Sequence, residues 1–205
     1  MCGIVGIYLK TKKFEKNLGK MLSGMLNNME SRGPDSAGFA IYKNEKKNIY
    51  KNSLCINELN FKKFKKEISN KIKKIQLSQH ADHVILKTAI EPKTVIKIIK
   101  TSFPGVSIVG YGHSIEIFKQ VGNPKDVVRK FKLDSFSGTH GIGHTRMATE
   151  SAITTDGSHP YSTGKDECLV HNGSLSNHNN LRRDLVKKGN IFTSENDTEV
   201  AAGYV

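Results

Sequence analysis

The chain begins Met1-Cys2-Gly3-Ile4-Val5-Gly6-Ile7-Tyr8. The run from Gly3 to Leu9 is short and apolar, which is typical of a buried β-strand. A small residue follows the initiator methionine, so we expect Met1 to be removed and Cys2 to begin the mature chain. An N-terminal cysteine carries a thiol and a free α-amino group whose unperturbed pKa, about 7.7 to 8.0, suits a general base. The opening therefore predicts a strand that presents an activated nucleophile, although a Met-Cys pair also occurs by chance.

Further motifs follow in order along the chain. They are Arg32-Gly33-Pro34-Asp35-Ser36-Ala37-Gly38, Gly143-His144-Thr145-Arg146-Met147-Ala148-Thr149, His159-Pro160, His171-Asn172-Gly173 and Asn196-Asp197-Thr198-Glu199. With the opening stretch, this ordered set resembles the class II glutamine amidotransferases of the N-terminal nucleophile hydrolase superfamily. The stretch from Leu169 to Tyr204 is most similar to the amidotransferase component of glutamate synthases. The resemblance covers about residues 1–43 and 138–205.

The resemblance implies an α+β fold, the four-layer αββα sandwich of the N-terminal nucleophile hydrolases. We expect residues 1–205 to form the N-terminal part of one type 2 glutamine amidotransferase domain. Because the family's domain continues beyond its Asp-Thr-Glu motif, we expect the sandwich to be incomplete at the C-terminus. A separate chain would then complete it. Between the two matching parts, alternating strand and helix patterns predict a small α/β subdomain inserted at about residues 60–133.

Hydrophobic periodicity predicts the individual elements. The expected helices are Phe14–Met29, an amphipathic helix from Phe61 to Ile75, Lys93–Thr101, Lys125–Phe131 and Glu199–Val205. The expected strands are Ala37–Tyr42, Asn48–Lys51, Val84–Ile90, Val106–Tyr111 and Ile115–Val121. The first two of these strands are expected to pair as a hairpin across a polar turn at Asn44–Lys47.

The resemblance also assigns roles to single residues. Asn172 through its side-chain amide and Gly173 through its main-chain N–H would form an oxyanion hole beside the catalytic Cys2. Arg146 would bind the α-carboxylate of glutamine with its planar fork, and Asp197 would hold the α-ammonium group. These two charges are what a zwitterionic amino acid requires of its pocket.

Other residues have more open assignments. Thr149 and His159 are expected to line the substrate pocket, with structural support as the alternative for His159. Arg32 and Asp35 are expected to brace the loop beside Cys2. The alternative for Asn172-Gly173 is a simple turn.

Asp197 has a further interpretation that needs no substrate, because it directly precedes a helical pattern. An aspartate in that position is a common helix N-cap. Binding the substrate and capping the helix are compatible, since a cap position leaves a carboxylate beside free main-chain groups.

The implied reaction is hydrolysis of L-glutamine to L-glutamate and ammonia through a Cys2 thioester. The ammonia would pass to a partner synthase subunit, expected to be glutamate synthase, where FMN and iron–sulfur clusters belong to the partner. We expect no cofactor in this chain. The alternative is a truncated, non-catalytic regulatory or interaction module that keeps a glutamine-binding pocket.

Composition narrows the remaining classes. The 205 residues suffice for one domain with a buried core, and the net charge of +13 alone would favour a nucleic-acid partner. The lysines are expected instead to form a solvated helix face, so neither nucleic acid nor a membrane is an expected partner. Three cysteines without CxxC spacing argue against a disulfide framework, and the histidines, including His113, His140 and His144, show no zinc motif. We therefore expect no metal and, without a signal peptide, a cytoplasmic location.

Overall fold

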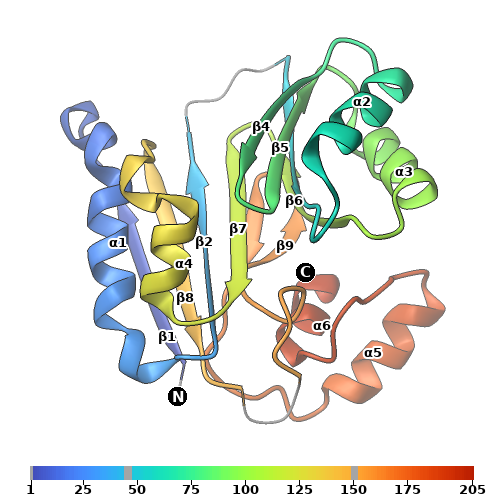
Figure 1. Ribbon diagram of the computed structural model, residues 1–205. Helices are drawn as coiled ribbons and strands as arrows, with labels where there is room; N and C mark the ends of the chain where they lie inside the picture. The colour runs from blue at the N-terminus through green and yellow to red at the C-terminus, as the bar shows by residue number, and fades with distance from the viewer. Residues whose placement is uncertain (1, 44–47, 149–151) are drawn as a thin grey trace.

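The computed structural model describes residues 2–43, 48–148 and 152–205. The predicted turn at Asn44–Lys47 and the predicted pocket residue Thr149 lie outside these ranges. Two four-stranded antiparallel sheets, sheet A and sheet B, dominate the fold (Figure 1). Sheet A has the order β1 (Gly3–Tyr8), β8 (His140–Arg146), β2 (Ser36–Tyr42), β7 (Ile115–Val121), and sheet B the order β4 (Gln76–His80), β5 (His83–Thr88), β3 (Tyr50–Cys55), β6 (Ser107–Gly112).

Helices cover the outer face of each sheet. The helices of the described residues are α1 (Leu18–Asn28), α2 (Phe61–Lys71), α3 (Pro92–Ser102), α4 (Pro124–Phe131), α5 (His178–Lys187) and α6 (Asp197–Tyr204). Helices α1 and α4 lie on sheet A, and α2 and α3 lie on sheet B (Figure 1). The remaining strands, β9 (Tyr161–Gly164) and β10 (Glu167–Leu169), form a two-stranded sheet.

Within the described ranges, three apolar cores separate four layers. Phe39 of β2 faces α1 and α4, whereas its neighbour Ala40 faces the opposite way, into the core between the sheets. In sheet B, Leu54 of β3 faces α2 and α3, and Cys55 faces sheet A. Both strands are thus buried on both faces, as successive side chains of a strand point to opposite sides. The predicted αββα sandwich is confirmed.

The segment predicted as an insertion, residues 60–133, contributes to both sheets. It supplies β5 and β6, which pair with β3 in sheet B, β4, which pairs with β5, and β7, which pairs with β2 in sheet A. It also supplies α4, which joins α1 in the first core. Its strands are therefore continuous with the sandwich, while the boundaries of an inserted unit stay a prediction.

The predicted hairpin between residues 37–42 and 48–51 is wrong. Strand β2 pairs with β7 and β8 in sheet A, whereas β3 pairs with β5 and β6 in sheet B. The two strands are close in sequence, but each is buried on both faces and has found partners in a different layer. Proximity along the chain indicated a pairing that long-range packing overrides.

Two helices show how the apolar stripe sets their limits. In α2 the apolar side chains at Phe64 and Ile68 are buried, and the surrounding lysines are exposed, as predicted. The side chain of Asn60 caps its start by accepting from two main-chain N–H groups. The first helix begins later than predicted, at Leu18, because residues 12–17 bury no side chain and form a 3₁₀ turn instead.

The N-terminus lies at the same end of the sandwich as α5 and α6 (Figure 1). The segment from residue 161 onward thus brings two helices to the point where β1 starts. Within the described part of the chain, no helix has the length and apolar character needed to cross a membrane.

Candidate active site

A pocket of about 550 Å³ opens where β1 begins and β8 ends. Among the predicted site residues, its lining includes Cys2, Arg146, His159, Gly173 and Asp197. Gly3 is paired with Thr145 in the antiparallel register of β1 and β8. This register places Cys2 beside the residues that follow Thr145, so the sheet itself joins the two ends of the site.

Cys2 is held through its main-chain carbonyl. That oxygen accepts hydrogen bonds from Arg32 Nε at 3.3 Å and from Asn172 Nδ2 at 3.0 Å. The Cys2 Sγ atom lies 3.8 Å from the carbonyl oxygen of Met147. The side chain is partly exposed, so the sulfur can meet a molecule in the pocket while the main chain stays fixed.

Arg32 and Asp35, for which a bracing role stays a prediction, contact main chain around the site. The Asp35 carboxylate accepts a hydrogen bond from Ala148 N at 2.7 Å, and the main-chain N–H of Asp35 donates to Arg146 O at 3.1 Å. Neither Arg32 nor Asp35 lines the pocket. Their contacts fix the loop after β8 and the carbonyl of Cys2.

The two charges predicted for an amino acid lie in the same pocket. Arg146 is only 4% exposed, and its Nη1 donates to Ala152 O at 3.1 Å. The Asp197 carboxylate accepts from Leu175 N at 2.7 Å and from the Thr198 hydroxyl at 3.2 Å. A buried cation and a carboxylate held by hydrogen bonds are thus presented to one cavity that Cys2 also reaches.

The alternative role of Asp197 as an N-cap is wrong. Asn196 precedes the first residue of α6, and its side-chain Oδ1 accepts from Thr198 N at 2.9 Å. Since the cap is already provided, capping does not account for the position of the Asp197 carboxylate. That carboxylate fixes the main chain of Leu175 instead.

Asn172 and Gly173 lie on an exposed, irregular stretch that bends at Gly173, and Asn172 contacts Cys2. The Asn172 amide reaches the Cys2 carbonyl, and Gly173 lines the pocket. A Cβ atom at position 173 would lie 2.7 Å from His171 Nε2, so a larger residue would require the His171 side chain to shift. The pair is thus placed beside the thiol, where donors to an oxyanion would be required.

His159 and His144 form a buried stacked pair that the sequence did not reveal. Their ring centroids are 4.0 Å apart with an interplanar angle of 26°, and the side chains are 3% and 1% exposed. His144 Nε2 donates to His171 O at 2.9 Å. Burial lowers the pKa of His144 to about 4 and holds the pKa of His159 well below its ordinary value, so both rings are neutral near pH 7.

In the sequence, His144 belongs to the Gly143–Thr149 motif and is otherwise considered as a metal ligand, but it has no predicted role in the pocket; its place two residues before Arg146 on β8 is the signal that points to the site. Further pocket residues have no role assigned from the sequence, although Met147, His171, Asn196 and Thr198 stand within the quoted motifs. These further residues are His171, Ser174, His178, Asn179, Arg182, Glu195, Asn196 and Thr198, with Met147. Most come from α5 and the start of α6, whose position against β1 depends on tertiary packing.

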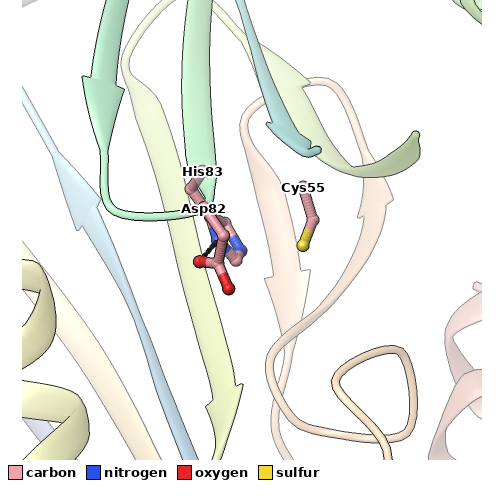
Figure 2. A group of neighbouring side chains, drawn as sticks. All are labelled: Cys55, Asp82 and His83. Atoms are coloured by element: carbon pink, nitrogen blue, oxygen red, sulfur yellow. Dashed lines mark hydrogen bonds and ion pairs between the residues drawn. The ribbon is translucent and has the colours of Figure 1, made fainter. Parts of the chain in front are cut away.

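One group among the described residues has the spacing of metal ligands. Figure 2 shows Cys55, Asp82 and His83, whose ligand atoms lie within 4.8 Å of one another. The two carboxylate oxygens of Asp82 are hydrogen-bonded to His83 Nδ1 at 2.9 Å and to Lys130 Nζ at 2.8 Å. Burial raises the pKa of the Cys55 thiol to about 11, which disfavours the thiolate that a metal needs. No member of the group lines the pocket, and the predicted lack of a metal stays a prediction.

Known proteins provide independent information on the family. The profile of a family described as "Glutamine amidotransferase domain" matches residues 134–204. The chain is 48% identical over 208 residues to "Glutamine amidotransferase-like protein GlxB" of Rhizobium meliloti (strain 1021), covering 100% of this chain and 69% of the relative. It is 33% identical over 220 residues to a "Putative glutamine amidotransferase" of Methanothermobacter thermautotrophicus, covering 100% of this chain and 72% of that one.

A shorter match links the chain to larger enzymes. It is 41% identical over 88 residues to a "Glutamine--fructose-6-phosphate aminotransferase [isomerizing]" of Methanococcus maripaludis, covering 42% of this chain and 15% of the enzyme. Among solved structures, "Structure of the allosteric regulatory enzyme of purine biosynthesis" superposes with a TM-score of 0.55 at 18% identity, over 98% of this chain and 28% of that chain. This last likeness supports the fold alone. Given the two relatives that match its whole length, the chain belongs to the class II glutamine amidotransferase family.

Proposed function

We propose that the protein is a glutaminase that hydrolyses L-glutamine to L-glutamate and ammonia at Cys2. The observation that carries the proposal is that Cys2, Arg146 and Asp197 line one pocket. A buried guanidinium matches the α-carboxylate of glutamine, and a carboxylate matches its α-ammonium group. The volume of about 550 Å³ lies in the range usual for small-molecule sites, about 300–1,000 Å³.

The first half of the reaction forms a thioester. The free α-amino group of a processed Cys2 accepts the thiol proton, and the thiolate attacks the side-chain amide carbon of glutamine. The resulting oxyanion accepts hydrogen bonds from Asn172 Nδ2 and Gly173 N–H. The protonated α-amino group of Cys2 then gives its proton to the amide nitrogen of the substrate. The C–N bond breaks, and ammonia leaves.

The second half restores the enzyme. Water attacks the thioester carbonyl carbon, with the α-amino group of Cys2 as base, and the C–S bond breaks. The thiol regains a proton and glutamate is released. The net change consumes one water and one glutamine for each glutamate and ammonia. The neutral His144–His159 pair keeps the pocket wall free of additional positive charge near pH 7.

Ammonia would pass to a synthase partner. The family matches include an 88-residue stretch of an enzyme named for amino transfer to a sugar phosphate, so amidotransferase domains of this type occur with different acceptors. The resemblance of Leu169–Tyr204 favours a glutamate synthase partner with FMN and iron–sulfur clusters. Glutamate synthase is therefore the proposed partner that receives the ammonia. The rival proposal is a regulatory or interaction module that binds glutamine without hydrolysing it.

The test combines the N-terminus, the product and the thiol. Mass spectrometry of the intact protein should show Met1 removed, and incubation with glutamine should release glutamate and ammonia in equal amounts. A glutamine analogue with an electrophilic carbon in place of the amide should label Cys2 and neither Cys55 nor Cys168. Active protein that retains Met1 would contradict the mechanism. Glutamine binding with no ammonia, alone or with the synthase partner, would favour the non-catalytic module.

A further inference from the structure

One cross-strand row of sheet A supports a single loop segment. In the register of the sheet, Gly38 of β2 is paired with Lys119 of β7 on one side and with His144 of β8 on the other. All three meet the segment of residues 156–159. Lys119 binds its carbonyls, the His144 ring stacks on His159, and a Cβ at Gly38 would lie 2.1 Å from His159 O. The segment therefore lies directly on the sheet, over a position that has no side chain.

Lys119 is an unusual residue to bury. It is 5% exposed, and its Nζ donates to Asp156 O at 3.0 Å and to Ser158 O at 2.9 Å. The Nζ atom also lies 4.5 Å from the centroid of the Tyr161 ring. Desolvation lowers the pKa of the amine to about 8. Burying an ammonium costs free energy that these carbonyls only partly offset. This cost favours a function for the amine beyond stability.

Asn196 completes the set of contacts on the same segment. Its Nδ2 donates to Gly157 O at 3.2 Å, while its Oδ1 caps α6. Three consecutive carbonyls, those of residues 156, 157 and 158, are thus bound by two side chains from different elements. Asn196 in addition ties this segment to the helix start that carries Asp197.

The segment ends at His159, whose ring lines the pocket. Among the described residues, neither ring nitrogen of His159 has a hydrogen-bond partner. The place of this ring is therefore set by its main chain, by stacking on His144 and by an edge contact with the Tyr161 ring, rather than by hydrogen bonds of its own. Whatever fixes the carbonyls of 156–158 fixes the wall of the pocket.

We propose that Lys119 is a positioning residue of the glutamine pocket, which acts with Asn196 through the 156–158 carbonyls to hold His159 and the start of α6 in place. This inference rests on the proposed function for its kinetic consequence. Its structural consequence, the fixed position of His159, is independent of catalysis.

The test uses three variants. Lys119→Met removes the amine and keeps a similar apolar stem. Asn196→Ser keeps a residue able to cap α6 but too short to reach Gly157. The matched control is Lys51→Met, because Lys51 is also buried and binds Glu116 and one carbonyl, that of Ser114, which lies outside the 156–159 segment.

Two readouts separate the inference from the proposed function. In glutaminase assays, we expect Lys119→Met to raise KM about tenfold and to change kcat less, as one or two hydrogen bonds from a charged group are lost. Diethylpyrocarbonate labelling, located by peptide mass spectrometry, should modify His159 several-fold faster in Lys119→Met and Asn196→Ser than in the wild type. Lys51→Met should match the wild type in both.

The outcomes are distinct. Wild-type protein without glutaminase activity would remove the proposed function, while the labelling of His159 would still judge the positioning role. Lys119→Met with wild-type KM and wild-type labelling would overturn the inference, as would equal changes in Lys51→Met. If Lys119→Met does not fold, Asn196→Ser decides by the same two measurements.

Discussion

The side-chain amide of Asn172 donates a hydrogen bond to the main-chain carbonyl of Cys2 over 3.0 Å. The residue expected to bind the oxyanion is thus already attached to the residue expected to create it, although 170 positions separate them. This contact fixes the amide beside the thiol before any substrate arrives. Pre-oriented donors of this kind stabilise developing charge without reorganisation during the reaction.

Replacement of Asn172 tests the oxyanion role. Asn172→Ala should lower kcat by about 10²–10³, as removal of one such donor does in other acyl-transfer enzymes, and change KM little. Steady-state glutaminase kinetics measure both. The control is Asn177→Ala at the N-cap position before α5, where the side chain makes no cap hydrogen bond. Comparable kcat values for the Asn172 variant and the wild type would reject the role.

Replacement of the nucleophile should stop chemistry and spare binding. Cys2→Ala is expected to produce no ammonia above background. Without the thiol, there is no proton for the α-amino group to accept and no thioester can form. Calorimetric titration should still show glutamine binding, since Arg146 and Asp197 are unchanged. Cys168→Ala, which removes a thiol outside the pocket, should retain activity. Hydrolysis by Cys2→Ala at the wild-type rate would end the mechanism.

The guanidinium of Arg146 should matter for its shape as well as its charge. Arg146→Lys should raise the KM for glutamine about 10- to 100-fold, because an ammonium cannot bind a carboxylate through two parallel hydrogen bonds. The matched control is Arg183→Lys on the exposed face of α5. An unchanged KM in the Arg146 variant would show that the carboxylate is bound elsewhere.

Gly38 should not tolerate a methyl group. In Gly38→Ala the new Cβ would meet His159 O at 2.1 Å, well inside contact distance, so the loop or the strand must move. We expect a loss of about 1–3 kcal/mol in the free energy of unfolding, measured by urea denaturation, with a raised KM. Gly24→Ala on α1, where a Cβ meets nothing within 4 Å, should instead be neutral or slightly stabilising. Equal stability of the two variants would contradict the close packing.

Acid should destabilise the fold through its buried histidines. The pKa of His144 is lowered to about 4, and that of His159 lies well below its usual value, whereas both titrate near pH 6.5 in the unfolded chain. Below about pH 6.5 the unfolded chain therefore binds protons that the folded chain does not. The free energy of unfolding should fall as the pH drops from about 6.5 towards 4.

Urea denaturation at pH 7.5, 5.5 and 4.5 measures this dependence. His144→Gln keeps a neutral hydrogen-bonding side chain and should show a shallower fall than the wild type. An equal slope in the two proteins would mean that His144 does not contribute. Carboxylates such as Asp82, whose pKa is lowered to about 2, stabilise the folded protein until the pH falls below about 4. Both proteins contain these carboxylates, so they do not change the comparison.

The sequence by itself predicted the fold class, the residues gathered in the pocket and much of the local structure. Cys2 at the start of a strand, the ordered motifs and the apolar stripe of α2 were all readable, because each depends on residues near one another in the chain. The amphipathic pattern fixed which face of α2 is buried. Short motifs also indicated that Arg146 and Asp197, which lie far apart in the chain, belong to one pocket.

Only the tertiary structure decided which strands pair and what supports the pocket. The assignment of β2 and β3 to different sheets depends on contacts between layers, which neighbouring residues do not encode. The row formed by Lys119, Gly38 and His144 exists because three distant strands share one register. A local pattern specifies what a residue can contribute to a strand, whereas register and layer are set by the packing of the whole core.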